Sequence, residues 1–312
     1  MAEQIALLFP GQGSQYVGMG RQLLEQFRVV RDTFQEASDV LGEDMARLCL
    51  EGPEERLRLT ANAQPAILSL SVATFRLLEQ ELGLRPTCAA GHSLGEYSAL
   101  VAAGAMAFKE AVLAVRRRGQ FMQEAVPEGQ GAMAAILGLD SDEVDRICRE
   151  MAGTEVVVAA NYNGPGQVVV SGHASAVERV GRAARQRGAK KVVGLPVSAP
   201  FHSPLLAPAG ERLRSVLEGM RFQDPAFPVI SNVDAAPYPP GGSMVDILAR
   251  QVSRPVRWEE SMRLMASWGT GLAVEVGPKK VLVGLLKRIA PELRALQVED
   301  AGGLQELARA LD

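Results

Sequence analysis

Two kinds of hydrophobic pattern alternate along the chain. Short continuous apolar runs, typical of strands buried on both faces of a sheet, occur at 5–9, 87–90, 229–231, 272–276 and 296–298. Longer stretches with amphipathic spacing predict helices within 30–83, the last over 63–82, and at 108–126, 205–218, 245–252, 256–268, 280–289 and 304–311. This alternation of strands and helices indicates an α/β protein with a mostly parallel sheet covered by helices.

The middle of the chain has a different rhythm. After a linker at 127–131, it predicts strands at 132–137, 155–161, 167–171 and 190–195, and helices at 141–151 and 174–187. This β-α-β-β-α-β order is typical of a compact ferredoxin-like unit. We therefore predict a large subdomain, 1–128 and 198–312, with a small subdomain, 129–197, inserted into it.

Composition and charge narrow the functional classes. The chain has 312 residues, is 47% hydrophobic and 22% charged, and carries a net charge of −3, which does not favour a nucleic-acid binder. Its first residues lack the basic region of a signal peptide, and no later apolar run is long enough to span a bilayer. The scattered Cys49, Cys88 and Cys148 show no metal-ligand spacing. We expect a cytoplasmic protein with no nucleic-acid or membrane partner.

The most informative motif is Gly-His-Ser-Leu-Gly at 91–95. It follows the apolar run 87–90 and precedes a segment with helical composition, 96–103. Strand, Gly-x-Ser-x-Gly and helix in this order predict a nucleophile elbow, in which a sharp turn exposes the serine hydroxyl. The N-terminus of the following helix favours negative charge close by. Ser93 is therefore the candidate nucleophile, and the N–H of Leu94 is a candidate oxyanion donor.

A serine hydroxyl needs a base, and the chain has three histidines. His92 adjoins Ser93 and would point away from it on the elbow. His173 precedes a helix of the inserted unit, where a structural role is the better interpretation. His202 lies in a proline-rich loop where the chain returns to the large subdomain. By elimination His202 is the candidate base, and a neutral group suffices to orient it because no acidic residue stands at a diagnostic spacing.

A second oxyanion donor is expected from another loop. Gly11-Gln12-Gly13 follows the apolar run 5–9, and such a turn can point backbone N–H groups at an anion. Its spacing is not that of a phosphate loop or a dinucleotide site. The turn alone is equally consistent with a plain strand-to-helix connection. The presence of the elbow serine makes the Gln12 N–H the working candidate.

Arg118 breaks the amphipathic pattern of the predicted helix 108–126. At about 100° per residue, Arg116 and Arg117 fall on the polar face, whereas Arg118 falls on the apolar face with Val115 and Met122. Arginine is rarely buried without an anionic partner. Two interpretations remain open, a structural ion pair with an Asp or Glu and a fork for a substrate carboxylate.

Taken together, these motifs resemble the malonyl-CoA:acyl carrier protein transacylase family. The matching segments span nearly the whole chain in order: Phe-Pro-Gly-Gln-Gly-Ser-Gln at 9–15, Gly-His-Ser-Leu-Gly-Glu-Tyr at 91–97, Arg118-Gly119 ahead of Met122-Gln123, Pro-Phe-His-Ser at 200–203, Arg250-Gln251 before Pro-Val-Arg-Trp at 255–258, and Glu-Val-Gly-Pro at 275–278. The resemblance implies an α/β-hydrolase-like core with an inserted ferredoxin-like subdomain, which agrees with the strand order above.

The resemblance also implies roles for the catalytic residues. Ser93 carries the malonyl group as an ester, and His202 is the general base and acid. Gln12 and Leu94 supply the oxyanion N–H groups. Gln251 orients His202 in place of an acidic third member.

Substrates and partners follow from the same resemblance. Arg118 pairs with the free carboxylate of malonate, while Met122 and Phe201 join it in binding the substrate, and the bulky Phe201 favours malonyl over methylmalonyl. Coenzyme A is a leaving group, so no cofactor or metal is expected. The acceptor is the phosphopantetheine thiol of an acidic acyl carrier protein, for which the basic stretch 179–191 is a candidate docking site, and we expect a monomer.

Three other classes of protein share part of this pattern. A serine thioesterase or esterase would use Ser93 and His202 but would leave Arg118 unexplained. A non-catalytic scaffold that binds carrier protein would need neither Ser93 nor His202, and it would not need the glycine-rich loop. A trans-acting polyketide acyltransferase shares every motif and differs only in the carrier protein that it serves.

Overall fold

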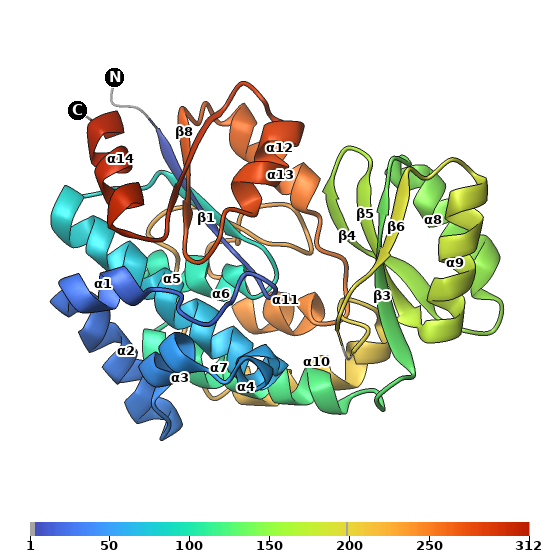
Figure 1. Cartoon of the computed structure of the whole chain (residues 1–312), viewed down its shortest axis with the longest axis horizontal. Helices are drawn as coiled ribbons and strands as arrows, with labels where there is room; N and C mark the ends of the chain where they lie inside the picture. Colours follow the sequence, from blue (N-terminus) through green and yellow to red (C-terminus); the bar gives the residue numbers. More distant parts are fainter. Residues whose placement is uncertain (1–3, 198, 312) are drawn as a thin grey trace.

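A computed structural model describes residues 4–197 and 199–311 of the chain (Figure 1). The start of the chain considered above for a signal peptide, residues 1–3, lies outside the described residues. So do Ser198, at the predicted return to the large subdomain, and Asp312. No helix in the described part is long and apolar enough to cross a membrane.

The larger sheet has five parallel strands in the order β7-β2-β1-β8-β9. The strands are β1 (Ile5–Phe9), β2 (Cys88–Gly91), β7 (Val229–Ile230), β8 (Leu272–Val276) and β9 (Arg294–Val298). Strands β1 and β8 are buried along their whole length, because helices cover both faces of the sheet. Burial on both faces explains why continuous apolar runs predict these strands, and the predicted parallel sheet is confirmed.

Strand β1 contributes alternate side chains to two separate cores. Leu7 and Phe9 face the larger one and Ala6 and Leu8 the smaller one. Around the first lie helices α1 (Arg21–Gln26), α2 (Arg28–Leu41), α3 (Met45–Glu51), α4 (Glu54–Arg58), α5 (Thr60–Leu82), α6 (Gly95–Ala102), α7 (Phe108–Glu124), α10 (Ala207–Leu217), α11 (Met244–Gln251) and α14 (Ala301–Leu311), with a short 3₁₀ turn at Pro204–Leu206. Around the second lie α12 (Trp258–Ser267) and α13 (Leu282–Ile289).

The smaller sheet is antiparallel and has the order β4-β5-β3-β6. Its strands are β3 (Gly131–Leu137), β4 (Val157–Gly164), β5 (Gln167–His173) and β6 (Lys191–Gly194), and helices α8 (Ser141–Ala152) and α9 (Ala174–Gln186) share a core with it (Figure 1). The predicted ferredoxin-like unit is therefore confirmed. Its strands lie inside the predicted limits 129–197, and the limits themselves stay a prediction.

Three helices begin two residues later than the hydrophobic pattern predicts. One is α10, which begins at Ala207 because the 3₁₀ turn Pro204–Leu206 precedes it, and the other two depend on contacts outside the helix. The predicted helix 256–268 begins at Trp258, because the Val256 N–H donates to the Ala160 carbonyl at 2.8 Å and the Val256 carbonyl accepts from the Tyr162 N–H at 2.9 Å. This bridge joins the large subdomain to β4. The predicted helix 280–289 begins at Leu282, where the buried Glu275 carboxylate accepts hydrogen bonds from the first backbone N–H groups of α13. The first contact is tertiary and the second comes from a residue six to eight positions earlier, outside the helix, so helical periodicity reveals neither of them.

Two glycines let the end of β1 and the segment after β2 pack backbone to backbone. A Cβ on Gly95 would lie 2.0 Å from the Phe9 carbonyl oxygen, and a Cβ on Gly11 would lie 2.4 Å from the His92 carbonyl oxygen. No other residue fits at such distances without moving a backbone segment. The glycine-rich loop is therefore pressed against the turn that carries Ser93.

Candidate functional site

The two predicted reacting groups meet at the carboxyl ends of the parallel strands. Ser93 follows β2 and His202 lies in the loop before α10, and Ser93 Oγ is 2.7 Å from His202 Nε2. Both residues have positive backbone φ, 52° and 57° respectively. Non-glycine residues rarely adopt this region, and such strain is concentrated at functional sites. The geometry is that of a nucleophile beside its base.

Two backbone carbonyls orient the His202 ring. Its Nδ1 lies 2.9 Å from the Gln251 carbonyl oxygen and 3.1 Å from the Arg254 carbonyl oxygen. Since a carbonyl only accepts, Nδ1 carries the proton and Nε2 is left to accept from the Ser93 hydroxyl. Gln251 thus contacts the histidine through its main chain, while its side chain reaches other groups. Sequence reasoning misses Arg254, because a backbone carbonyl leaves no side-chain signal.

The environment of His202 keeps its ring neutral. The side chain is buried, and this burial, together with the positive charge of Arg118, lowers the pKa of His202 to about 3. The two carbonyls oppose the shift but do not reverse it. A neutral imidazole at physiological pH can take a proton from Ser93.

Arg118 places a buried positive charge at the site. It is only 2% exposed, and its Nη2 donates to Ser93 Oγ at 3.0 Å and to Gln251 Oε1 at 2.8 Å. Its Nη1 donates to Gln64 Oε1 at 2.8 Å, and its Nε has no partner among the described residues. No described ion pair joins Arg118 to a carboxylate, so the structural ion-pair interpretation is not supported. A buried guanidinium surrounded by neutral acceptors beside a nucleophile is suited to an anionic substrate group.

The two candidate oxyanion donors approach Ser93 from different loops. Leu94 is the N-cap residue of α6, and Gln12 lies in the loop after β1, where its side chain donates to Thr60 Oγ1 at 3.2 Å. Neither the Leu94 N–H nor the Gln12 N–H is a donor in the backbone hydrogen bonds of the described residues. Both N–H groups are therefore available to an oxyanion.

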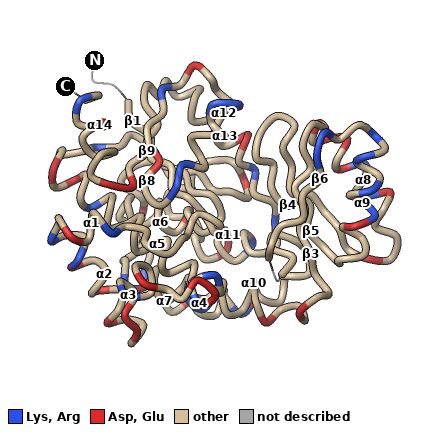
Figure 2. Tube along the Cα trace, viewed as in Figure 1, with Lys and Arg blue, Asp and Glu red and all other residues tan. Residues whose placement is uncertain are grey.

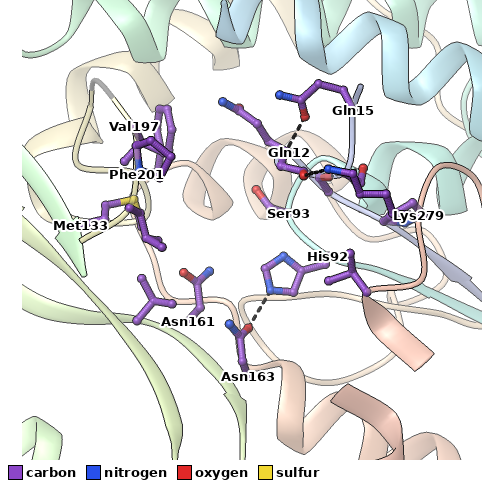
Figure 3. Close-up of a pocket in the computed structure, with 18 of the residues that line it drawn as sticks. Gln12, Gln15, His92, Ser93, Met133, Asn161, Asn163, Val197, Phe201 and Lys279 are labelled. Atoms are coloured by element: carbon purple, nitrogen blue, oxygen red, sulfur yellow. Dashed lines mark hydrogen bonds between the residues drawn. The ribbon is translucent and has the colours of Figure 1, made fainter. Parts of the chain in front are cut away.

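These groups face a cavity of about 520 Å³ between the two sheets (Figure 3). Six of the eight predicted site residues line it: Gln12, Ser93, Arg118, Met122, Phe201 and His202. The other two, Leu94 and Gln251, are buried behind its wall. The small subdomain contributes Met133, Asn161 and Asn163, so the cavity has walls from both parts of the chain. His92 also lines it, and its Nε2 lies 2.8 Å from Asn163 Oδ1.

Asn232 is a structural support that sequence reasoning misses. Its Oδ1 accepts from the Ser93 N–H at 2.6 Å, and its Nδ2 donates to the Gly91 carbonyl at 2.7 Å. One amide thus holds both sides of the strained turn. A signal for it exists, because Asn232 follows an apolar strand that pairs in parallel with β2, and the carboxyl ends of such strands meet at one edge.

Glu96 is a second residue that the sequence prediction overlooks. It lies in the first turn of α6, is fully buried, and accepts from the Asn232 N–H at 2.9 Å, from Gln251 Nε2 at 2.8 Å and from the Tyr238 hydroxyl. Its signal is an acidic residue at the start of a helix that is otherwise apolar or small. Buried polar groups of this kind are found where hydrogen bonds fix a specific geometry.

Comparison with known proteins places the chain among acyltransferases. Residues 6–304 match the family model of the acyl transferase domain. The chain is 48% identical over 301 residues to the malonyl CoA-acyl carrier protein transacylase of Escherichia coli strain K12, covering 96% of this chain and 97% of that protein. It is 46% identical over 298 residues to the protein of the same name from Bacillus subtilis strain 168, covering 95% and 94%.

Solved structures agree with the sequence comparison. The malonyl CoA-acyl carrier protein transacylase of Coxiella burnetii superposes with a TM-score of 0.98 at 43% identity, covering 100% of this chain and 98% of that one. A malonyl-transacylase solved in complex with a type II PKS acyl-carrier protein gives a TM-score of 0.96 at 47% identity, covering 98% and 99%. The chain therefore belongs to the acyl transferase family and, within it, to the malonyl-CoA:acyl carrier protein transacylases that its motifs resemble.

Proposed function

We propose that the chain moves the malonyl group from malonyl-CoA to the phosphopantetheine thiol of acyl carrier protein, and so supplies fatty-acid elongation. The observation that carries the proposal is the buried Arg118 guanidinium 3.0 Å from Ser93 Oγ. It puts a positive charge beside the nucleophile, where the free carboxylate of a malonyl ester would lie. The names of the relatives support the same donor and acceptor.

In the first half-reaction, the Ser93 hydroxyl gives its proton to His202 Nε2 as Oγ attacks the thioester carbonyl. The negative charge that develops on the carbonyl oxygen is stabilised by the Leu94 and Gln12 N–H groups. Collapse of the tetrahedral intermediate breaks the carbon–sulfur bond. Coenzyme A leaves with the proton from His202, and malonyl remains as an ester on Ser93.

In the second half-reaction, the carrier thiol gives its proton to His202 Nε2 and its sulfur attacks the ester carbonyl. The same two N–H groups stabilise the oxyanion. The bond to Ser93 Oγ then breaks, and Oγ recovers its proton from His202. Both half-reactions balance with proton transfers alone, so we propose that the chain uses no resident cofactor or metal.

The rest of the cavity would select the acyl group. The malonyl carboxylate lies one methylene beyond the ester carbonyl, within reach of Arg118, and charge-assisted hydrogen bonds from arginine to a carboxylate are strong. Met122 and Phe201 line the same cavity and would contact the methylene. A thioesterase for malonyl esters could use the same guanidinium, so the transferase is favoured by the shared name of the relatives.

The cellular setting is proposed on separate observations. Carrier proteins of fatty-acid and polyketide synthesis present the same thiol, and one solved relative is in complex with a type II PKS acyl-carrier protein. We favour the fatty-acid carrier over a trans-acting polyketide role because of the relatives' shared name. The three free buried cysteines support a reducing cytoplasm, and a monomer is proposed because one chain supplies every group of the site.

The docking site of the carrier is proposed within the basic stretch 179–191. Two of its arginines are engaged inside the small subdomain, Arg179 with Glu155 at 2.8 Å and Arg187 with Glu143 at 3.0 Å. Figure 2 shows these opposite charges mixed over α8 and α9. Lys190 and the first residue of β6, Lys191, are both exposed. We therefore narrow the proposed contact with the acidic carrier to these two lysines.

The nucleophile can be tested by intact-protein mass after brief incubation with malonyl-CoA. We expect a mass increase of one malonyl group in the wild type and none in Ser93→Ala, because only the hydroxyl can form the ester. The adduct should be discharged by carrier protein. Accumulation of free malonate without an adduct would indicate a hydrolase, and neither adduct nor turnover would indicate a scaffold.

The carboxylate role of Arg118 can be tested by selectivity. In Arg118→Ala we expect kcat/KM for malonyl-CoA to fall by about 100-fold, since an anionic group loses its buried partner, while uncharged acyl thioesters gain activity. Arg116→Ala is the matched control on the same helix, because Arg116 pairs with Glu43 instead. Unchanged selectivity in Arg118→Ala would exclude the proposed role.

The pH dependence of acylation tests the state of His202. Protonation removes the base, and the pKa is lowered from its ordinary 6.5 to about 3, so activity should be lost only in strongly acidic solution. We expect kcat/KM for malonyl-CoA to change less than about twofold between about pH 7.5 and 5.5, in protein shown to be folded by circular dichroism. A tenfold loss per pH unit below 6.5 would contradict this environment.

The docking proposal predicts a selective effect on the second substrate. In Lys190→Glu/Lys191→Glu we expect KM for carrier protein to rise about tenfold, because like charges oppose its acidic surface, while acylation by malonyl-CoA is unchanged. Arg182→Glu, at an exposed arginine of α9 that is paired with Glu178, is the control and should have a smaller effect. An unchanged KM for carrier protein in the double variant would place docking elsewhere.

A further inference from the structure

The buried Glu96 carboxylate takes no part in the reaction steps above. It is fully buried, and its partners are the Gln251 side chain, the Asn232 backbone and the Tyr238 hydroxyl. None of these partners carries a positive charge. Burying a carboxylate without a paired cation is costly, so its hydrogen bonds require a structural explanation.

Glu96 helps to fix the orientation of the Gln251 side-chain amide. Its Nε2 donates to Glu96 Oε2 at 2.8 Å and to the Ser93 carbonyl at 2.9 Å, and its Oε1 accepts from Arg118 Nη2 at 2.8 Å. A flipped amide would set its oxygen against two acceptors and its NH₂ group against the Arg118 donor. Glu96 and the Ser93 carbonyl therefore fix the one amide orientation that suits Arg118.

We propose that Glu96 is a positioning residue for malonyl selectivity, because it holds the Gln251 amide in the orientation that keeps the Arg118 guanidinium beside the acyl group. This inference rests on the proposed role of Arg118. Glu96 itself touches neither the substrate nor the reacting atoms. Its effect on Arg118 passes through the Gln251 side chain.

The opposite side of the guanidinium is held less firmly. Arg118 Nη1 donates to Gln64 Oε1 at 2.8 Å, and among the described residues the other side-chain contact of Gln64 is that of its Nε2 with Met122 Sδ at 3.8 Å. Thioether sulfur is a weak acceptor. The amide of Gln251 is therefore the stronger of the two supports. If it were free to rotate, Arg118 would gain rotamers and its alignment with a carboxylate would weaken.

The length of the Glu96 side chain matters more than its charge. Burial raises the pKa of Glu96 to about 7, against the opposing effect of its hydrogen-bond donors. A neutral Glu96 still offers Oε2 to Gln251 and Asn232, while its proton can go to the Tyr238 oxygen. A glutamine here can do the same with its NH₂ group facing Tyr238, whereas an aspartate is one methylene too short to reach Gln251.

The test compares these two substitutions by the ratio of kcat/KM for malonyl-CoA to that for acetyl-CoA. We expect Glu96→Gln to keep the ratio within about threefold of the wild type, because the acceptor is retained. We expect Glu96→Asp to lower it at least about tenfold through a higher KM for malonyl-CoA, with acetyl transfer within about threefold. A merely structural role would lower both rates in the same proportion.

Glu275→Asp is the matched control, because Glu275 is also a fully buried carboxylate with three hydrogen-bond donors and contacts none of Ser93, Arg118 and Gln251. It should leave the ratio unchanged even if stability falls. An unchanged ratio in Glu96→Asp, or equal losses of both rates, would overturn the proposal.

Should Glu96→Asp fail to fold, Gln251→Met removes the intermediate amide with little change in volume and leaves the backbone contact with His202. We expect the same fall in the ratio, and an unchanged ratio would overturn the proposal.

The result for Arg118→Ala separates the proposed role of Glu96 from the proposed role of Arg118. If that variant loses selectivity while Glu96→Asp keeps it, only the role of Glu96 fails. If Arg118→Ala keeps selectivity, the proposed carboxylate site fails first.

Discussion

The positive charge of Arg118 is buried beside the nucleophile, and much of the surrounding structure depends on holding it there. Helix α7 can approach α5 closely because Gly119 faces the Ala61 backbone, where a Cβ would lie 2.6 Å from the Ala61 Cα. This approach brings Gln64 of α5 to the guanidinium. The same charge helps to keep His202 neutral, so Arg118 affects His202 as well as Ser93, to which it donates a hydrogen bond. The neutral amide oxygens of Gln64 and Gln251 accept hydrogen bonds from the guanidinium without cancelling its positive charge.

The sequence predicts the parts of this arrangement that local chemistry determines. Continuous apolar runs identify strands such as β1, and the elbow motif with a count of histidines identifies Ser93 and His202. The contacts of Glu96 with Asn232 and Tyr238 join residues 136 and 142 positions apart, so neither periodicity nor a motif exposes them. A long-range contact, between Val256 and Ala160, also decides the late start of α12, whereas the start of α13 depends on Glu275, only seven positions before Leu282.

The two sheets contribute different parts of the site. The parallel sheet brings its loops to one edge, where Ser93 and the Gln12 loop converge, as expected for open α/β sheets. The antiparallel sheet adds the opposite wall of the cavity and contributes few groups that could react. The hydrogen bond between His92 and Asn163, which both line the cavity, ties the two walls together. Chemistry is thus concentrated in one subdomain and enclosure in the other.

The bridge between Val256 and β4 has a mechanical consequence. Arg254, whose carbonyl holds the His202 ring, lies two positions before Val256, whose backbone is hydrogen-bonded to Ala160 and Tyr162. A tilt of the small subdomain would therefore act as a lever on the segment that aligns the imidazole. The width of the cavity between the two subdomains and the orientation of the His202 imidazole would therefore change together, because residues 254–256 contact both. A partner that binds the small subdomain could thus change the position of the His202 ring without contacting Ser93 or His202.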